Sequence, residues 1–412
     1  MSELSVSTKK FGSNFWSLWT ATAFSNLGDG IYKFVIPILA TQVTNSPMLV
    51  AGVSFALTLP WLLFSLPAGA MVDRMDRKKV MVATNIICAA MMAFLFLGTV
   101  SGHIQISIIL AVSFLLGTCE TLSMNASGAL VPAVVPRDRL EQANSRIVGI
   151  ETIMNSFIGK PVAGFLITIS AALTLASGTA FYIITIMALM SMRGTFKVNR
   201  TRDTTIGSDI AEGIRYLWNH RLLRTLAVMV ALMSACWSGF FAVLVLFALS
   251  ENGMHLSEFE YSLLLTSLAA GALAGASLVM PIQRLLGRRW LLGFDIVGTI
   301  VMLLIPAITS NVFLVGIAIF IGGFGGGTWN VAVNSIRQRM VPNELLGRVY
   351  AVYRLVSWGT LPLGALLAGI ITQWFGVQTF FLIAALVNVS LFVPLLKVLT
   401  NENLRLQMKV DA

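Results

Sequence analysis

Long apolar runs separated by short polar breaks dominate the chain. A helix that crosses a membrane needs about 20 mainly apolar residues, and a window of that length finds twelve candidates among the 412 residues. The breaks between most of them are only a few residues long. The pattern therefore predicts an all-α membrane protein with twelve transmembrane helices. The runs cover residues 15–41, 48–71, 79–100, 104–128, 139–168, 170–193, 222–250, 258–283, 289–309, 312–335, 344–374 and 378–398.

One break is much longer than the others. Residues 194–221 form a polar stretch between the sixth and seventh runs, and residues 209–218 within it have the composition of an amphipathic surface helix. We therefore predict three parts. A six-helix bundle covers residues 1–193, a cytoplasmic linker with a short amphipathic helix covers 194–221, and a second six-helix bundle covers 222–412.

The chain also repeats itself at about half its length. Val135-Pro136 follows the fourth run and Val341-Pro342 follows the tenth, 206 positions later. Gly69 and Gly275, at the inner ends of the second and eighth runs, have the same separation. Two parallel halves of this kind place a substrate path at their interface, near the midplane of the bilayer.

Charged residues are scarce and unevenly placed. They make up 11% of the chain, less than half of the roughly 25% found in an ordinary soluble domain. With both termini in the cytoplasm, Lys and Arg lie almost entirely on the cytoplasmic side and none lies in an outer loop, as the positive-inside rule requires. The net charge of +10 is then mainly a signature of topology, and we expect no nucleic-acid partner.

The chain lacks the motifs of enzymes and metalloproteins. Its three cysteines, Cys88, Cys119 and Cys236, lie in apolar runs without CxxC spacing or histidine partners. No phosphate-binding loop, nucleophile elbow or zinc motif occurs. We therefore expect no enzymatic activity and no cofactor, with a proton gradient as the energy source. The expected partners are the lipid bilayer and a small-molecule substrate, and we expect a monomer.

Three segments resemble the major facilitator superfamily. Residues 69–79, GAMVDRMDRKK, resemble the signature loop between its second and third helices. Residues 25–32 and 346–364 are similar to its drug and siderophore exporter branch, which includes macrolide-efflux and enterobactin-exporter relatives. The chain departs from that pattern at Val279, which replaces the aspartate of the loop in the second half, and at Lys160, where antiporter relatives have glycine before the proline.

The resemblance covers essentially the whole chain. It implies a secondary transporter of the inner (cytoplasmic) membrane that exports an amphipathic small molecule by alternating access, in a rocker-switch movement of two bundles. A drug, a macrolide-like compound or a siderophore would be such a molecule, and proton antiport would drive it. A lysophospholipid or other lipid flippase of the same fold is the alternative, and a non-transporting membrane receptor is a distant one.

The first apolar run contains two charged residues whose presence inside the membrane requires an explanation. A charge at the bilayer centre costs about 2.5–3.5 kcal/mol, yet Asp29 and Lys33 lie one helical turn apart near the middle of this run. Asn26 shares their helix face. Asp29 would either bind a proton or the cation of a substrate, or form a structural ion pair with Lys33.

Further intramembrane charges lie in the fourth, fifth and eleventh runs. Glu120 and Glu151, the latter with Asn155 one turn away, would bind cations or protons in a central cavity or join helices through hydrogen bonds. Lys160 either contacts an anion or extends its amine outward. Arg354 would contact substrate, pair with Asp295, or stay near the inner headgroups.

The resemblance also implies gating residues at the cytoplasmic surface, namely Asp73, Arg74, Arg77 and Arg348. A carboxylate at position 73 would cap the dipole of the eleventh helix, which begins near Glu344, and would hold the halves together. Simple cytoplasmic anchoring is the alternative explanation.

Two further features of the chain are predicted to be structural. The glycine run 322–327 lies inside a membrane helix, where it favours close helix packing or bending. Trp237, Trp329 and Trp358 either anchor and pack the helices or line an apolar path.

Overall fold

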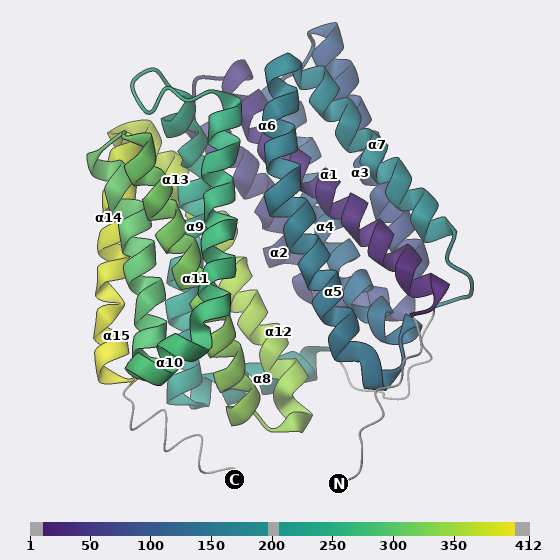
Figure 1. Ribbon diagram of the computed structural model, residues 1–412, viewed down its shortest axis with the longest axis vertical. Helices are drawn as coiled ribbons and strands as arrows, with labels where there is room; N and C mark the ends of the chain where they lie inside the picture. Colours follow the sequence, from purple (N-terminus) through teal and green to yellow (C-terminus); the bar gives the residue numbers. More distant parts are fainter. Residues whose placement is uncertain (1–10, 197–205, 400–412) are drawn as a thin grey trace.

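The computed structural model describes residues 11–196 and 206–399, except for a few side chains near the cytoplasmic helix ends. This part of the chain is helical apart from short connections (Figure 1). The N-terminal half contains α1 (Ser13–Val43), α2 (Pro47–Arg74), α3 (Arg77–Ser101), α4 (Ile106–Val134), η1 (Arg137–Arg139), α5 (Leu140–Thr152), η2 (Ile153–Gly159), α6 (Lys160–Ile169) and α7 (Ala171–Met190). The linker forms α8 (Ile206–Asn219), and the C-terminal half contains α9 (Arg221–Leu249), α10 (Glu258–Ile308), α11 (Val312–Met340), α12 (Asn343–Gly359), α13 (Leu361–Phe375), α14 (Val377–Ser390) and α15 (Phe392–Lys397).

These elements combine into twelve membrane helices. Eleven described segments are long and apolar enough to cross a bilayer, and α1, whose 31 residues extend over roughly 46 Å at about 1.5 Å per residue, is the twelfth. α10 provides two of the eleven, because the chain turns at Gly287, whose φ of 80° suits a residue without a side chain. The predicted fold class is confirmed. The polar linker contains the helix α8.

The two halves share a distinctive interruption. The fifth membrane helix of the first half contains the π-helical turn η2 just before Pro161, and its counterpart in the second half breaks at Thr360 just before Pro362. Proline has no backbone N–H to donate and its ring crowds the preceding turn, so each helix rearranges at this point. The internal repeat in the sequence thus corresponds to matching irregularities in the structure.

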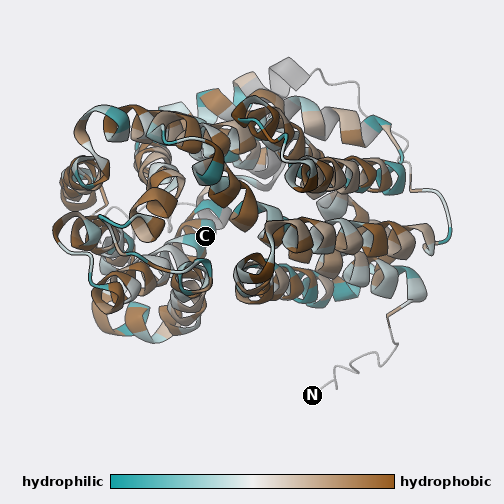
Figure 2. Ribbon diagram, turned by 90° about the horizontal axis from the view of Figure 1, so that it is seen from above, coloured by the Kyte–Doolittle hydropathy of each residue, from teal (hydrophilic) through white to brown (hydrophobic). Residues whose placement is uncertain are grey.

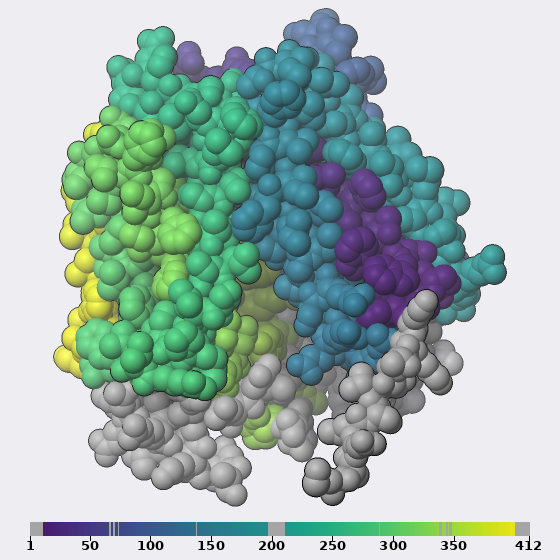
Figure 3. Space-filling model, in the orientation of Figure 1, coloured from purple at the N-terminus to yellow at the C-terminus, as the bar shows by residue number. Residues whose placement is uncertain are grey.

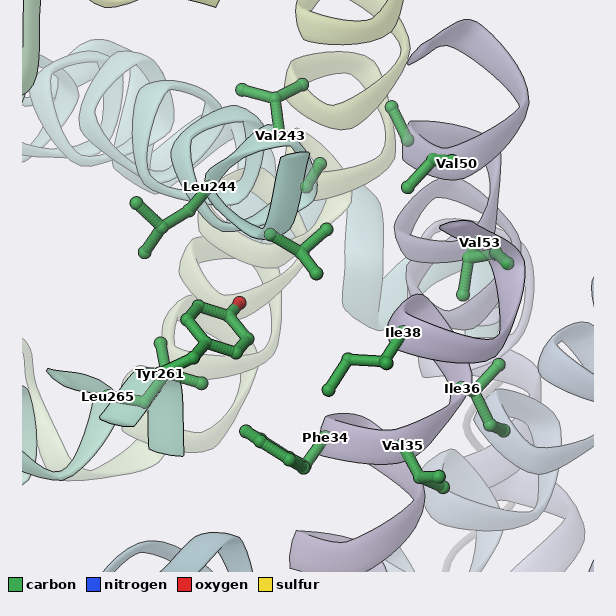
Figure 4. Close-up of a cluster of buried hydrophobic side chains, with 14 of the residues drawn as sticks. Phe34, Val35, Ile36, Ile38, Val50, Val53, Val243, Leu244, Tyr261 and Leu265 are labelled. Atoms are coloured by element: carbon green, nitrogen blue, oxygen red, sulfur yellow. The ribbon is translucent and has the colours of Figure 1, made fainter. Parts of the chain in front are cut away.

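The two halves pack tightly at one end of the molecule. The rings of Phe34 in α1 and Tyr261 in α10 stack with centroids 5.5 Å apart, and Ser46 Oγ donates to Gln373 Oε1 over 2.9 Å. Figure 4 shows Phe34 and Ile38 facing Tyr261 and Leu265 within one buried apolar cluster. All these residues lie towards the outer surface in the topology given by the basic residues.

The halves separate toward the end where α1 begins and α15 ends. Figure 1 shows α5 and α12 diverging there, and the space-filling view in Figure 3 shows a hollow between the halves at the same place. Seen from above in Figure 2, hydrophobic residues cover the helices of both halves, as lipid-facing surfaces require. The molecule is therefore closed at its outer end and open toward the cytoplasm.

The glycine run in α11 packs between the two arms of α10. A Cβ built on Gly323 would lie 2.1 Å from the carbonyl oxygen of Leu268 in the first arm. One built on Gly325 would lie 2.6 Å from the Cα of Asp295 in the second arm. Close helix packing, the structural explanation of this run, is confirmed. Gly326 is different, because its Cβ would approach the ring of Trp237.

We expect Gly323→Ala to lower thermal stability. The added methyl group has no space beside a backbone carbonyl, and overpacking of this kind costs about 1–3 kcal/mol. Gly149→Ala is the matched control, because a Cβ at Gly149 in α5 meets nothing within 4 Å. Melting temperatures of the purified proteins in detergent should fall for the first variant and not for the second. Equal melting temperatures would contradict this account of the α10–α11 contact.

Candidate functional site

Two adjoining cavities lie between the halves. The first has a volume of about 270 Å³ and is lined mostly by α1, α3 and α4. The second has a volume of about 370 Å³ and is lined by α9, α10, α11 and α12. Trp358 of α12 lines both. Together they match the roughly 300–1,000 Å³ of sites that bind drug-sized molecules.

Asp29 lies in the first cavity beside a tyrosine. The Tyr182 hydroxyl in α7 donates to Asp29 Oδ1 over 2.7 Å, and the Tyr182 side chain is fully buried. Asn26 also lines this cavity, while its amide donates to the Thr22 carbonyl one turn earlier. The Asp29 carboxylate thus faces the cavity, with a neutral phenol as its hydrogen-bond donor.

Lys33 pairs with Glu120 rather than with Asp29. Its Nζ lies 2.6 Å from Glu120 Oε1 in α4, and the Tyr32 hydroxyl donates to the other carboxylate oxygen over 2.8 Å. The direct Lys33–Asp29 ion pair, the structural alternative for these two residues, is therefore not formed. Spacing along one helix brought both side chains to one face, but a second helix supplies the carboxylate that Lys33 reaches.

Glu151 joins the same cavity from the fifth membrane helix. It lines the first cavity with Asp29 and Glu120, so the three acidic residues predicted within the membrane runs of the N-terminal half meet there. Asn155 lies in η2, where its backbone carbonyl closely approaches Gly30 of α1; a Cβ at that glycine would lie 2.5 Å from the oxygen. Asn155 thus marks a helix contact and does not line either of these two cavities.

Arg354 connects the two halves. Its Nη2 donates to Asn125 Oδ1 in α4 over 3.1 Å, and its guanidinium lies 5.5 Å from the ring centroids of Trp61 and Trp358. The possible pair with Asp295 is not formed. Arg354 lines the second cavity, in agreement with the predicted substrate contact.

The second cavity also contains two charged residues that the sequence did not single out as site residues. Asp295 is 4% exposed, and its Oδ1 is buried without a hydrogen-bond partner among the described residues. Arg337 is 6% exposed, although the sequence assigned it to a cytoplasmic segment. The predicted tenth run ended at residue 335, whereas α11 continues to Met340 and carries Arg337 inward. The charges around residue 337 in the sequence did not indicate that Arg337 would be buried at a cavity.

The three tryptophans left undecided by the sequence all line the second cavity. The Trp237 indole donates to Thr299 Oγ1 over 2.9 Å, which fixes the ring. Trp358 packs against Trp61 of α2, with ring centroids 4.4 Å apart. These large rings give both cavities an apolar surface.

The predicted gating residues stay a hypothesis. The side chains of Asp73 and Glu344 lie outside the described residues. Arg74 is exposed at the end of α2, and Arg77 Nη1 donates to the Ala129 carbonyl in α4 over 2.7 Å.

Two more predicted basic residues lie away from the cavities. Arg348 forms an ion pair with Glu212 of α8, which ties the linker helix to α12. Lys160 lies half-buried at the start of α6 and does not line either of the two cavities. The two cavities therefore give no support to the anion contact predicted for Lys160.

The central space is electrically asymmetric. Three carboxylates face it from the N-terminal half, one of them paired with Lys33, and two arginines and one carboxylate face it from the C-terminal half. No group of three or more potential metal ligands occurs in the described part of the chain. The cavities thus combine charged side chains with an apolar lining.

We expect the Lys33–Glu120 pair to act as a unit in stability. Glu120→Gln leaves the Lys33 charge without its partner, whereas Lys33→Met with Glu120→Gln removes both charges. The single variant should melt below the double variant when thermal unfolding is measured in detergent. A double variant that melts lower than both single variants would show that the charges are not coupled in this way.

Comparisons with known proteins agree with this geometry. The family model for transmembrane secretion effectors matches residues 11–408. The multidrug efflux pump Tap of Mycobacterium tuberculosis is 25% identical over 378 residues, covering 89% of this chain and 88% of Tap. Macrolide efflux protein A of Streptococcus pyogenes is 23% identical over 413 residues, covering 96% and 98%. The crystal structure of the nucleoside transporter NupG has the same fold, with a TM-score of 0.75, 12% identity, and coverage of 93% and 99%.

The family match extends over nearly the whole chain, and the multi-pass helical fold is that of a transporter. The chain belongs to the transmembrane secretion effector family and is a membrane transporter of the major facilitator superfamily.

Proposed function

We propose that this transporter exports an amphipathic small molecule from the cytoplasm and that protons moving inward drive the export. The observation that carries the proposal is the cavity itself, which opens toward the cytoplasm between the halves and combines tryptophan rings with carboxylates. Apolar walls with a few polar groups suit amphipathic ligands. The names of the relatives, efflux pumps for several drugs and for macrolides, support the same substrate class and direction.

Asp29 is the proposed proton-coupling residue. Its carboxylate faces the first cavity next to the Tyr182 hydroxyl, and the cationic Lys33 is engaged by Glu120 instead. A carboxylate in this position can take up a proton when the cavity opens outward and release it when the cavity opens inward. Substrate binding and proton binding would then exclude each other at one site.

Alternating access would follow from breaking the outer contact and closing the inner opening. The outer contact consists of small or aromatic groups, such as the Phe34–Tyr261 stack and Gly164 against Ser262. Such a surface can separate without leaving charges buried. We place the protein in the cytoplasmic membrane as a monomer that needs no cofactor beyond the proton gradient.

We expect Asp29→Asn to abolish proton-driven transport without unfolding the protein. Asparagine can still accept the Tyr182 hydrogen bond but cannot exchange a proton. The test uses everted vesicles energised with a proton gradient and a panel of macrolides and cationic dyes, chosen by a resistance screen in an efflux-deficient host. Asp138→Asn, an exposed carboxylate in the cytoplasmic η1 segment, is the control. Undiminished gradient-driven uptake by the Asp29 variant would refute the coupling role.

Cross-linking the outer end tests alternating access. Cysteines at Ser46 and Gln373, whose side chains meet across the two halves, should stop transport when oxidised and restore it when reduced. The matched control joins Ser17 and Ser191, whose hydroxyl oxygens are 2.9 Å apart within the N-terminal half. That cross-link should leave transport intact. If the inter-half cross-link forms completely and transport continues, the outer end does not need to open.

A further inference from the structure

Two guanidinium groups face the second cavity without an acidic partner. Arg337 of α11 and Arg354 of α12 both line it, and among the described residues neither forms an ion pair. Arg337 is 6% exposed. A guanidinium buried inside a protein is costly unless something of opposite charge accompanies it.

The Arg337 guanidinium is held in a fixed plane. It stacks 4.1 Å from the ring centroid of Tyr350 and 3.9 Å from that of Tyr353. Asn334 Oδ1 accepts from both Arg337 Nη2 and the Tyr350 hydroxyl, while Arg337 Nε is buried without a partner. Stacking occupies the faces of the group and leaves the remaining N–H donors along its edge, the arrangement that binds carboxylates and phosphates in a bidentate way.

Arg354 and Tyr353 provide a second set of hydrogen-bond donors beside Arg337. Arg354 follows Tyr353 directly in α12, and one of its nitrogen atoms donates to Asn125 of the other half. The Tyr353 hydroxyl is buried without a hydrogen-bond partner among the described residues, and it lines the same cavity. Tyr353, whose ring lies against the Arg337 guanidinium, thus lines the same cavity as both arginines.

The acidic residue of this cavity does not neutralise them. Asp295 packs against Gly325, which lies twelve residues before Arg337 in α11, or about 18 Å along the helix at about 1.5 Å per residue. The other cavity carboxylates, Asp29, Glu120 and Glu151, line the N-terminal side. Arg337 therefore stands near the cytoplasmic end of α11, separated along the C-terminal wall from Asp295.

We propose that Arg337, Arg354 and the Tyr353 hydroxyl form a subsite for an anionic oxygen group of the substrate, such as a carboxylate. The subsite deepens the proposed export function and rests on it. The apolar body of the same molecule would lie against Trp358 and Trp329. An amine elsewhere on the molecule would face the carboxylates of the N-terminal half, so amphipathic acids and zwitterions are the substrate class that the cavity selects.

Acid and ester pairs on one scaffold test this directly. Ciprofloxacin and its methyl ester, and fusidic acid and its methyl ester, are the probes, with binding to the purified transporter measured by quenching of tryptophan fluorescence. We expect each acid to bind about tenfold more tightly than its ester, as one charge-assisted contact provides. Arg337→Gln or Arg354→Gln should reduce the ratio of acid to ester affinity to about one.

Two further variants separate recognition from folding. Arg337→Lys keeps the charge but loses the planar fork, so it should retain only part of the preference. Arg224→Gln removes an exposed arginine that contacts the Trp218 carbonyl far from the cavity, and it should keep the full preference. Melting temperatures without ligand identify any variant that fails to fold.

These experiments distinguish failure of the anion subsite from failure of the proposed export function. If both esters bind as well as their acids, or if neither acid binds, the anion subsite is overturned. The export proposal would still stand if the wild-type protein carried any amphipathic probe outward across proteoliposomes under a proton gradient. No outward transport of any probe would count against the export proposal itself.

Discussion

The structure depends on one constraint, which is that a polar group inside the hydrocarbon region must find its partner within the protein or face a water-filled cavity. Lys33, Tyr32 and Glu120 satisfy it by joining α1 to α4 through an ion pair and a hydrogen bond. Asp29 satisfies it through Tyr182 of α7. These contacts fix the register of the helices in the N-terminal half, and they leave its carboxylates directed into the central space.

The C-terminal half meets the same constraint in a different way. Its glycine run lets α11 approach both arms of α10 closely, so packing rather than ion pairing holds these helices together. Its charged residues, Arg337 and Asp295, are buried at the cavity with donors or acceptors left unmatched. The N-terminal half therefore contains one ion pair at the central space, and the C-terminal half has buried charged groups with unmatched donors or acceptors. A ligand between them would complete what the C-terminal wall lacks.

Much of the architecture could be predicted from the sequence, because it depends on hydropathy and on the distribution of basic residues. The twelve helices, their topology and the helix in the linker follow from those patterns. The site was predicted less completely. Asp29, Glu120, Glu151 and Arg354 do line the cavities. Arg337 was missed, because the end of an apolar run does not show where a helix ends, and α11 extends past it.

By itself, the sequence determined the number of helices, the orientation of the chain and the scarcity of charges within the membrane. These are properties of single segments in lipid, where cost depends on composition and length. Only the tertiary structure decided which charges pair. Lys33 lies one helical turn from Asp29, a spacing at which charged side chains can pair, yet it binds Glu120. Partner choice depends on where neighbouring helices place their side chains, and no spacing along one helix contains that information.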